Sequence, residues 1–284
     1  MTIKVHPTAT VGSEVELGPG VEIGPNCVLT GRVKIGAKTI VAGHNYLVGP
    51  LTIGGENVIY PFTCLGFSPQ HTGFAHDQEG PGLTIGDRNV FREHVTIHRA
   101  TSETEPTRIG DGNWFMVSSH AGHDVQIGNS CVLTNDVLVA GHTILEDNVI
   151  FGGKAAIGQR LRVGRLAFVG GGVGMARNVL PFMLARQVEP HVSVNVVGLR
   201  RSGMSREEIT NVRWAFRTIL QQKLIRATAI ETLRERADSS SAVREIIAFL
   251  EQVHGPILGE GGEYTVDTDA DIEVAASEQG NVTS

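Results

Sequence analysis

The chain is poor in the large rings from which most soluble domains build a core: aromatic residues make up only 5% of its 284 residues. A core without rings must be filled by small and β-branched side chains, which suits a repetitive strand architecture. Cysteine is also scarce. Cys27, Cys64 and Cys131 form no CxxC pair, so they indicate neither a disulfide framework nor a thiolate metal site. We interpret them as small thiols in a reducing compartment.

Long apolar runs are missing as well. No stretch approaches the roughly 18 residues needed to span a bilayer, and the first residues lack the basic and apolar regions of a signal peptide. We therefore expect a cytoplasmic protein without stable membrane insertion. Lysine and arginine form no basic stripe, so binding to nucleic acid is not expected.

The formal charge of −6 arises at one end of the chain. Residues 255–284 contain seven acidic residues and no lysine or arginine, whereas the rest of the sequence has 24 basic and 23 acidic residues. A strongly charged segment with few large apolar residues cannot bury enough surface to fold. We interpret 255–284 as an acidic, disordered tail.

What the sequence does contain is a six-residue repeat. From Val5 to Leu65 an aliphatic residue recurs every six positions, the next position is usually glycine, and the fifth is mostly small or β-branched. The phase is interrupted near 71–84 and 98–108, and then runs unbroken from Ile109 to Leu180. So many matching hexads cannot arise by chance and indicate a solenoid.

A six-residue period fits neither the face of an α-helix nor one long alternating strand. It predicts short strands joined by tight corners, where the glycine permits a backbone turn. Successive coils would stack at roughly 4.8 Å, and the aliphatic position would line the interior. We therefore expect a parallel β-helix over residues 1–190, with loop insertions at the two interruptions.

The pattern changes after residue 190. Ser205 and Glu208 are spaced as a capping box, which marks the start of a helix. Apolar residues then follow at spacings of three and four, as in an amphipathic helix, at Ile209, Val212, Phe216 and Ile219. The stretches 229–236 and 242–253 read similarly. We expect a small α-helical domain over 191–254.

Polar residues gather at one edge of the expected solenoid. If three hexads close one coil, residues i and i+18 stack, so His123 lies under Gly141 and then Gln159, beside the column Asp124, His142 and Arg160. A histidine suits general-base chemistry near neutral pH. Asp124 could orient that imidazole, and a glycine one coil away could offer its N–H to an oxyanion. This column is the candidate catalytic site.

At these residues the chain resembles the UDP-N-acetylglucosamine O-acyltransferases that begin lipid A synthesis in Gram-negative bacteria, within the hexapeptide-repeat acyltransferases. The hexads carry only the superfamily resemblance. The more specific segments are IGDRN (85–89), VTIHRAT (95–101), SHAGHD (119–124), VAGH (139–142) and NVVGLRRSGMS (195–205). The resemblance covers about 5–250. It implies a mainly β fold, a left-handed parallel β-helix of triangular coils followed by a small α-helical C-terminal domain.

The resemblance also implies residue roles. His123 matches the base that takes the proton of the sugar 3-hydroxyl, and Gly141 the glycine whose amide stabilises the oxyanion. The implied substrate site comprises Gln70, His71, His120, His142, Gln159, Gly171, Asn195 and Arg201, Gly171 setting acyl length and the last two meeting the nucleotide. The family acts as a homotrimer, takes its acyl group from the phosphopantetheine of acyl carrier protein, and needs no metal or other cofactor.

Several positions depart from the family pattern and bear on the acceptor, which leaves a 3-amino sugar nucleotide as an alternative. They are His71, Gly73, Gly158, Val197 and Ser202. Two other hypotheses stay open. One is a zinc site of His120, His123 and His142, as in gamma-class carbonic anhydrases. The other is a non-catalytic trimeric solenoid that binds a sugar nucleotide.

The expected carrier protein is acidic, and the helical region could attract it. Ten basic residues lie there, at Arg200, Arg201, Arg206, Arg213, Arg217, Lys223, Arg226, Arg234, Arg236 and Arg244. Clustered charge of one sign can steer a docking partner of the opposite sign. The competing interpretation is an ordinary helical domain with solvated charges.

Overall fold

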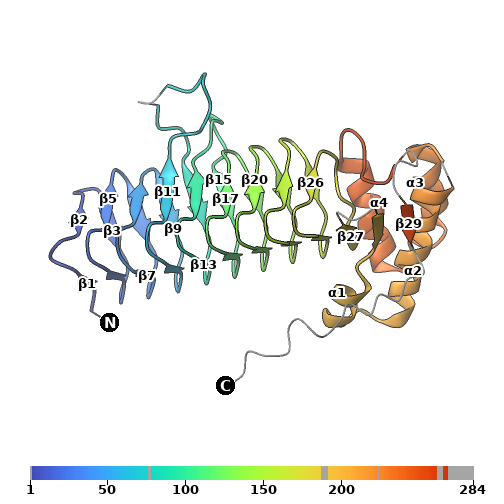
Figure 1. The fold of residues 1–284 in the computed structure, drawn as a ribbon, viewed down its shortest axis with the longest axis horizontal. Helices are drawn as coiled ribbons and strands as arrows, with labels where there is room; N and C mark the ends of the chain where they lie inside the picture. Colours follow the sequence, from blue (N-terminus) through green and yellow to red (C-terminus); the bar gives the residue numbers. More distant parts are fainter. Residues whose placement is uncertain (1, 76–77, 187–190, 223, 261–264, 268–284) are drawn as a thin grey trace.

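The computed structural model describes residues 2–75, 78–186, 191–222, 224–260 and 265–267. Short strands follow one another along the chain and pair with strands one coil away (Figure 1). Within the described residues they form three sheets, one for each side of a triangular coil. The structure therefore confirms the prediction of a mainly β fold in which a parallel β-helix precedes a group of α-helices.

Sheet A is built, in spatial order, of β1 Lys4–Val5, β4 Glu22–Ile23, β7 Ile40–Val41, β10 Val58–Ile59, β13 Val90–Phe91, β16 Trp114–Phe115, β19 Val132–Leu133, β22 Ile150–Phe151, β25 Phe168–Val169, β27 Met183–Arg186, β28 His191–Val194 and β29 Thr265–Asp267. Sheet B contains β2 Thr10–Val11, β5 Val28–Thr30, β8 Tyr46–Val48, β11 Cys64–Phe67, β14 Thr96–His98, β17 His120–Ala121, β20 Leu138–Val139, β23 Ala156–Ile157 and β26 Gly174–Met175. Sheet C contains β3 Val15–Leu17, β6 Val33–Ile35, β9 Leu51–Ile53, β12 Leu83–Ile85, β15 Thr107–Ile109, β18 Gln126–Ile127, β21 Ile144–Leu145 and β24 Arg162–Val163.

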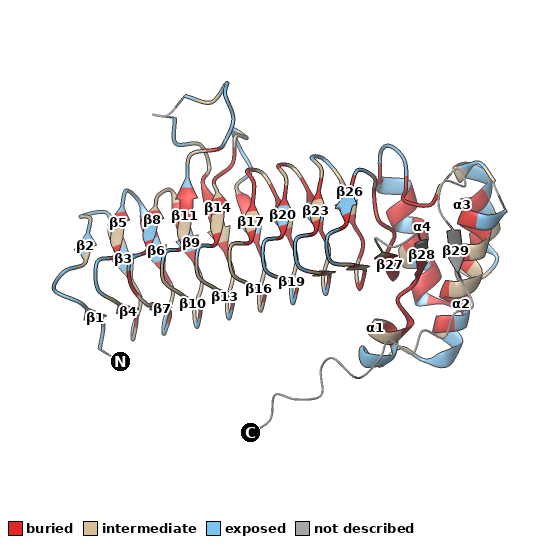
Figure 2. Ribbon diagram, in the orientation of Figure 1, coloured by how far each residue is buried: buried red, intermediate tan, exposed pale blue. Residues whose placement is uncertain are grey.

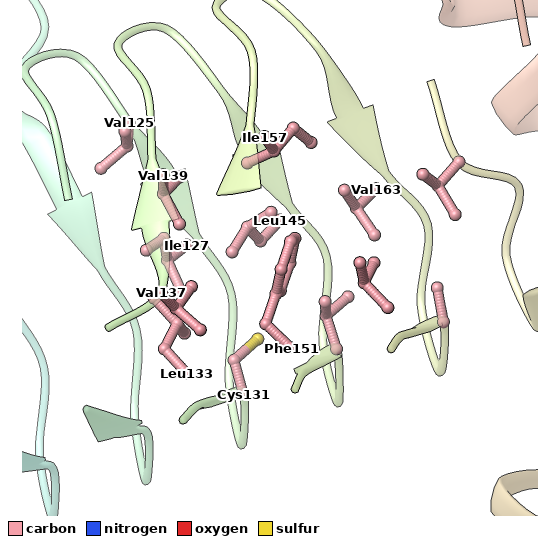
Figure 3. Packing of buried hydrophobic residues seen from close by; sticks show 14 of the residues in the cluster. Val125, Ile127, Cys131, Leu133, Val137, Val139, Leu145, Phe151, Ile157 and Val163 are labelled. Carbon is pink, nitrogen blue, oxygen red and sulfur yellow. The ribbon is translucent and has the colours of Figure 1, made fainter. Parts of the chain in front are cut away.

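The first position of each hexad lines the interior, as the sequence predicts. From Ile23 to Val169 the side chains at this position are at most 3% exposed, and Figure 3 shows several of them pointing into the coil. The first coil is the exception, because no coil lies beneath it. Val5 is 44% and Val11 36% exposed, and the burial colours of Figure 2 change along the first coils.

The prediction that the second-position glycine makes the turn is wrong. The positive φ angles occur two residues later, at the fourth position of the hexads, for example at Asn26, Asp124 and His142. The glycine is needed because the next coil passes close to it. A Cβ on Gly110 would lie only 2.5 Å from the carbonyl oxygen of Gly128, which is closer than real Cβ contacts.

The fifth position carries buried asparagines that the repeat pattern does not predict. Asn57, Asn89 and Asn113 are fully buried. The Oδ1 of Asn57 accepts hydrogen bonds from the backbone N–H (2.8 Å) and Nδ2 (3.0 Å) of Asn89, and Asn89 accepts from Asn113 in the same way. These three side-chain amides are thereby hydrogen-bonded to neighbouring coils, which removes most of the cost of their burial.

The helices follow the reversal of chain direction between β27 and β28, which pair antiparallel. They are α1 Val196–Arg201, α2 Arg206–Phe216 with a π-helical turn at Arg217–Gln221, α3 Arg226–Arg234 and α4 Ser241–Gln252. The predicted helices correspond to α2, α3 and α4, whereas the sequence pattern does not indicate α1. We keep the domain division near residue 190 as a proposal. Within the described residues, no helix is long and apolar enough to cross a membrane.

The predicted capping box is only half formed. Ser205 Oγ accepts the Glu208 N–H at 3.1 Å, as expected. The Glu208 carboxylate does not return to Ser205 and instead caps α4, where it accepts hydrogen bonds from Ser240 Oγ and the N–H groups of Ser241 and Ala242. One glutamate therefore joins the beginnings of two helices.

The predicted boundary between the folded body and the acidic tail lies too early in the sequence. Ile257 and Leu258 are buried, and Asn178 of the last coil donates from Nδ2 to the carbonyl oxygens of His254 and Pro256. Residues 255–260 therefore belong to the folded body, as does β29, which pairs with β28. Both findings correct the prediction of a disordered tail over 255–284. Residues 261–264 and 268–284 lie outside the described residues.

We predict that Gly110→Ala lowers the free energy of unfolding by about 1–3 kcal/mol, the usual cost of overpacking. Gly158→Ala is the matched control, because Gly158 has the same hexad position but an added Cβ would lie 3.4 Å from its nearest neighbour, the carbonyl oxygen of Met175. Urea unfolding followed by circular dichroism at one protein concentration measures both. Equal losses in the two variants would contradict this account of the glycines.

Candidate active site

Both insertions leave the β-helix at the corner where sheet B leads to sheet C (Figure 1). The first follows β11 and the second follows β14. In sheet C, Leu83 of β12 pairs with Leu51 on one side and with Thr107 on the other, so each insertion lies within a single coil and lengthens it. The next coil, in which Arg108 pairs with Gln126, has the regular length of three hexads. The extra residues therefore gather at one corner.

The same corner carries His123, directly beneath Gly141 as the sequence predicts. The His142 N–H donates to the carbonyl oxygen of His123 at 3.0 Å, and the Arg160 N–H donates to that of Gly141 at 3.2 Å. A Cβ placed on Gly141 would lie 2.9 Å from His123 Nε2. The imidazole and the glycine backbone are thus in contact across one coil.

His123 is oriented by its chain neighbour. The residue is 6% exposed, and its Nδ1 lies 2.7 Å from Asp124 Oδ2. Because an ionised carboxylate only accepts hydrogen bonds, Nδ1 carries the proton and donates it to Asp124. Nε2 is then the unprotonated nitrogen, and it is the one that faces Gly141.

Asp124 is fixed in turn by the second insertion. Its carboxylate accepts hydrogen bonds from the N–H and Oγ1 of Thr101 and from the N–H of Ser102, at 2.6–3.1 Å. Burial pushes the pKa of the Asp124 carboxyl upward, but the hydrogen bonds from Thr101, His123 and the two amides outweigh it, so the pKa is lowered overall. Asp124 is therefore ionised at neutral pH.

Two further imidazoles contact His123. The rings of His142 and His71 both lie edge-on to it, with centroid separations of 5.1 and 5.8 Å. His71 comes from the first insertion and His142 from the next coil. Burial lowers the pKa of His142, although Asp124 opposes the shift from 3.7 Å away. Neutral His142 can thus act as a hydrogen-bonding group beside the base.

His120 and His98 form a second histidine pair on sheet B. Their ring centroids are 5.4 Å apart, His120 Nδ1 shares a hydrogen bond with Thr96 Oγ1, and His98 Nδ1 donates to the Ser68 carbonyl oxygen at 2.7 Å. Burial, followed by repulsion from His98 and His123, lowers the pKa of His120 to about 4. The sequence pattern does not single out His98. Its place at the end of the strand before the second insertion, within VTIHRAT, is the signal that could have.

A groove of about 730 Å³ runs from His123 along sheet B. Its floor is the outward column Leu138, Ala156 and Gly174, three residues paired in register across adjacent coils. Gln70 and Gln159 line it as well, and both are predicted site residues. The side chains of this column become smaller from Leu138 to Gly174, so an apolar ligand has more space farther from His123.

The Gly141 amide is left available at this corner. At the corner between sheets C and A, side chains cap the equivalent amides: Asn129 Oδ1 accepts the Asp111 N–H, and Asp147 Oδ1 accepts the Asn129 N–H. Among the described residues, no hydrogen-bond acceptor is found for the Gly141 N–H. This amide can therefore donate to a ligand in the groove.

Three predicted site residues lie elsewhere in this chain. Gly171 is exposed at the corner before β26, at the far side of sheet B. Asn195 is buried at the start of α1, where Oδ1 accepts the Gly198 N–H and Nδ2 donates to the carbonyl oxygen of Leu166. Arg201 is exposed at the end of α1. The single chain does not bring these residues to His123.

The geometry does not favour the zinc hypothesis. Within the described residues, the group with metal-ligand spacing is His123, Asp124 and His142, so His120 is not part of it. Asp124 already accepts hydrogen bonds at both carboxylate oxygens, and His123 Nδ1 is directed at Asp124 rather than toward a shared centre. A metal would have to displace these bonds.

We predict that His120 makes stability depend on pH. Its pKa is about 4 in the folded protein and 6.5 as the ordinary value, so the unfolded chain binds more protons between these values and stability falls as pH drops from 6.5 to 4. His120→Asn should reduce that slope, whereas replacing the exposed His6 should not. Melting temperatures measured across this range test it. Parallel curves for wild type and His120→Asn would contradict it.

Comparisons with known proteins show which family the chain resembles. Residues 178–257 match the family model described as UDP-N-acetylglucosamine O-acyltransferase, domain 2. A curated relative from Halorhodospira halophila, named acyl-(acyl carrier protein)–UDP-N-acetylglucosamine O-acyltransferase, is 40% identical over 90% of this chain and 99% of its own length. A relative of the same name from Anaeromyxobacter sp. is 38% identical over 87% of this chain and 96% of its own length.

Solved structures show the same similarity. The UDP-N-acetylglucosamine O-acyltransferase of Moraxella catarrhalis superposes with a TM-score of 0.86 at 32% identity, covering 91% of this chain and all of that one. The acyltransferase of Francisella novicida gives 0.87 at 26% identity over 98% of this chain and all of that one. The chain belongs to the family of UDP-N-acetylglucosamine O-acyltransferases.

Proposed function

We propose that this protein transfers an acyl group from acyl carrier protein to the 3-hydroxyl of UDP-N-acetylglucosamine, the first step of lipid A biosynthesis. One observation carries the proposal: an imidazole held by a buried carboxylate faces a free glycine amide one coil above it. That pair supplies a base and an oxyanion donor. The family membership supplies the substrates.

The base is His123. With Nδ1–H directed at Asp124, Nε2 is free to take the proton of the sugar 3-hydroxyl as the oxygen attacks the thioester carbonyl. Asp124 stabilises the resulting imidazolium without taking its proton. The second insertion contributes through Thr101, which keeps the carboxylate in place.

The carbonyl oxygen becomes an anion in the tetrahedral intermediate, and the Gly141 N–H donates a hydrogen bond to it. When the intermediate collapses, the carbon–sulfur bond breaks and the phosphopantetheine leaves as a thiolate. The proton on His123 Nε2 then passes to that sulfur. The base returns to its starting state, and the products are the acylated sugar nucleotide and free carrier thiol.

The acyl chain would lie in the groove along sheet B. Its floor of Leu138, Ala156 and Gly174 is apolar and begins beside His123, so a chain attached at the thioester carbonyl would continue along it. Burial of each methylene there contributes about 0.8 kcal/mol. Gly171 does not line this groove within one chain, so we propose no role for it in setting acyl length from this chain alone.

We also propose a homotrimer, and the faces of the β-helix support it. The outward column of sheet A is apolar over seven paired residues: Ile40, Val58, Val90, Trp114, Val132, Ile150 and Phe168. The outward column of sheet C is mostly polar, with Lys34, Thr52, Thr84, Arg108 and Gln126. In a threefold assembly of triangular prisms each subunit has two of its faces covered. Sheet A is the apolar face, and the outward column of sheet B is apolar over Leu138, Ala156 and Gly174 beyond the polar Thr96 and His120.

A neighbour's sheet A face would then cover the sheet B groove. Trp114 is 46% and Leu138 51% exposed in the single chain, which fits surfaces that a second subunit covers. This arrangement would place each site between subunits. We propose that Arg201 reaches the nucleotide through it, and that Asn195, whose Oδ1 and Nδ2 are both used within the chain, acts by fixing the start of α1.

We also propose that an acidic carrier protein docks on the helical region. Several basic residues of this region already have partners within the chain and are poorer candidates for this contact. Arg226 pairs with Glu260, and Arg234 with Glu251. Arg236 lies over the Trp214 ring and donates to Asn211. Lys223 lies outside the described residues. Arg206, which is exposed at the start of α2 and is not assigned to the nucleotide, is the better candidate.

One transfer assay tests both the identity of the acceptor and the acyl-transfer reaction. Purified protein is incubated with a panel of acyl carrier proteins, labelled in the acyl chain, and with UDP-N-acetylglucosamine or its 3-amino analogue. We expect label in UDP-N-acetylglucosamine. Transfer to the amine alone would establish the related acyltransferase, and nucleotide binding without transfer to either would favour the non-catalytic solenoid.

We predict that His123→Ala lowers the rate of acyl transfer by about 10²–10⁴-fold, the usual contribution of a positioned general base. Melting temperature and oligomeric state should stay as in wild type. His6→Ala is the control, because His6 is exposed on the first coil. A fully active His123→Ala protein would end the proposed mechanism.

We predict that Trp114→Asp disrupts the trimer, since it places a charge in the apolar column of sheet A. Thr52→Asp is the control on the polar, exposed face of sheet C. Sedimentation velocity measures the mass of each variant. Trimers of undiminished stability in Trp114→Asp would show that sheet A is not the interface.

A further inference from the structure

Arg99 is a buried cation without a carboxylate. It directly follows β14 and is 5% exposed, and no carboxylate among the described residues lies within ion-pair distance of its guanidinium. Its Nε has no hydrogen-bond partner there either. Burial lowers the pKa of Arg99, and attraction to Glu79 offsets this only in part. Burying a cation without a carboxylate costs free energy, so its other contacts must explain its position.

The guanidinium contacts both ends of the first insertion. One terminal nitrogen, Nη2, donates to Ser68 Oγ at 3.0 Å and to the Gln78 carbonyl oxygen at 2.9 Å. The other, Nη1, donates to the carbonyl oxygen of Gly66 in β11 at 3.3 Å. The end of β11, the start of the insertion and its return are thus held by one side chain.

The part of the insertion between these anchors lies against the reaction centre. His71 packs edge-on to His123, and Gln70 lines the groove. Few contacts hold this part from within: the Phe74 N–H donates to the His71 carbonyl oxygen at 3.0 Å, and His71 Nδ1 accepts the Gly73 N–H. The place of His71 therefore depends on where the ends of the insertion are fixed.

We infer that Arg99 is a positioning residue that sets the first insertion over the active site and thereby holds His71 against His123. The inference rests on the proposed function for its effect on turnover, but not for its effect on the insertion. A branched cation is suited to the task because it reaches acceptors in several directions at once. A lysine would offer its donors from one point.

The matched control is Arg32. It also holds the first insertion, through an ion pair of 2.6 Å with Glu79, but this pair is exposed on both sides. Exposed pairs contribute little and are screened by salt. Arg32→Gln therefore removes a cation from the same insertion without removing the buried anchor.

The first measurement is amide hydrogen exchange of the full-length protein, read by mass spectrometry for a peptide spanning 68–75. We expect faster exchange in Arg99→Gln and wild-type exchange in Arg32→Gln. Arg99→Lys should lie between them, and it carries the test if Arg99→Gln does not fold. Wild-type protection in Arg99→Lys or in a folded Arg99→Gln variant would overturn the inference, whatever reaction the protein catalyses.

The second measurement is a double-mutant cycle on kcat/KM for acyl transfer. Arg99→Gln should lower kcat/KM by about 10- to 100-fold, the cost of misplacing a group at a reaction centre. If Arg99 acts through His71, the same change in a His71→Ala background should cost only about 3-fold or less. Equal losses in both backgrounds would overturn the positioning role. A wild-type protein without transferase activity would refute the proposed function and leave the exchange result standing.

Discussion

The structure depends on one constraint, the vertical register of coils that each consist of three hexads. This register lets strands pair in three sheets, brings aliphatic side chains together in the interior, and places asparagine amides where a neighbouring coil can accept their hydrogen bonds. It also lays the Gly141 backbone against the His123 ring. Fold and site are therefore two results of the same repeat, and neither can shift alone.

The site differs from the corner between sheets C and A in how its polar groups are used. At the corner between sheets C and A, the side chains of Asn129 and Asp147 cap the backbone amides of their neighbours. At the corner between sheets B and C, Gly141 keeps its amide free, and Asp124 is held by an insertion rather than by a coil. The insertions add Gln70 and His71 to a groove whose floor is formed by regular coils. The coils of the β-helix set the distances between the site residues, and the insertions lie over the site.

Much of the fold and of the site could be predicted from the sequence, because a constant repeat length determines which residues stack on adjacent coils. Counting three hexads along the chain was enough to place His123 under Gly141 and to bury the first position of each hexad. The periodicity could not predict contacts made by segments without a period. The bonds of Thr101 to Asp124, the pairing of His98 with His120 and the anchoring by Arg99 all depend on the path of the insertions. The periodicity also does not indicate why the hexad glycines are needed, since the contact that requires them comes from another coil.

The repeat also limits how such a protein can change in length. A residue added within a strand of the uninterrupted coils would shift the hexad phase, so that interior and surface positions would be exchanged in the rest of that strand. A whole added coil would instead move Gly141 away from His123 if it entered between them, but leave the pair intact anywhere else. Length variation within this architecture should therefore occur as complete coils outside the pair or as loops at corners, the form that both insertions take.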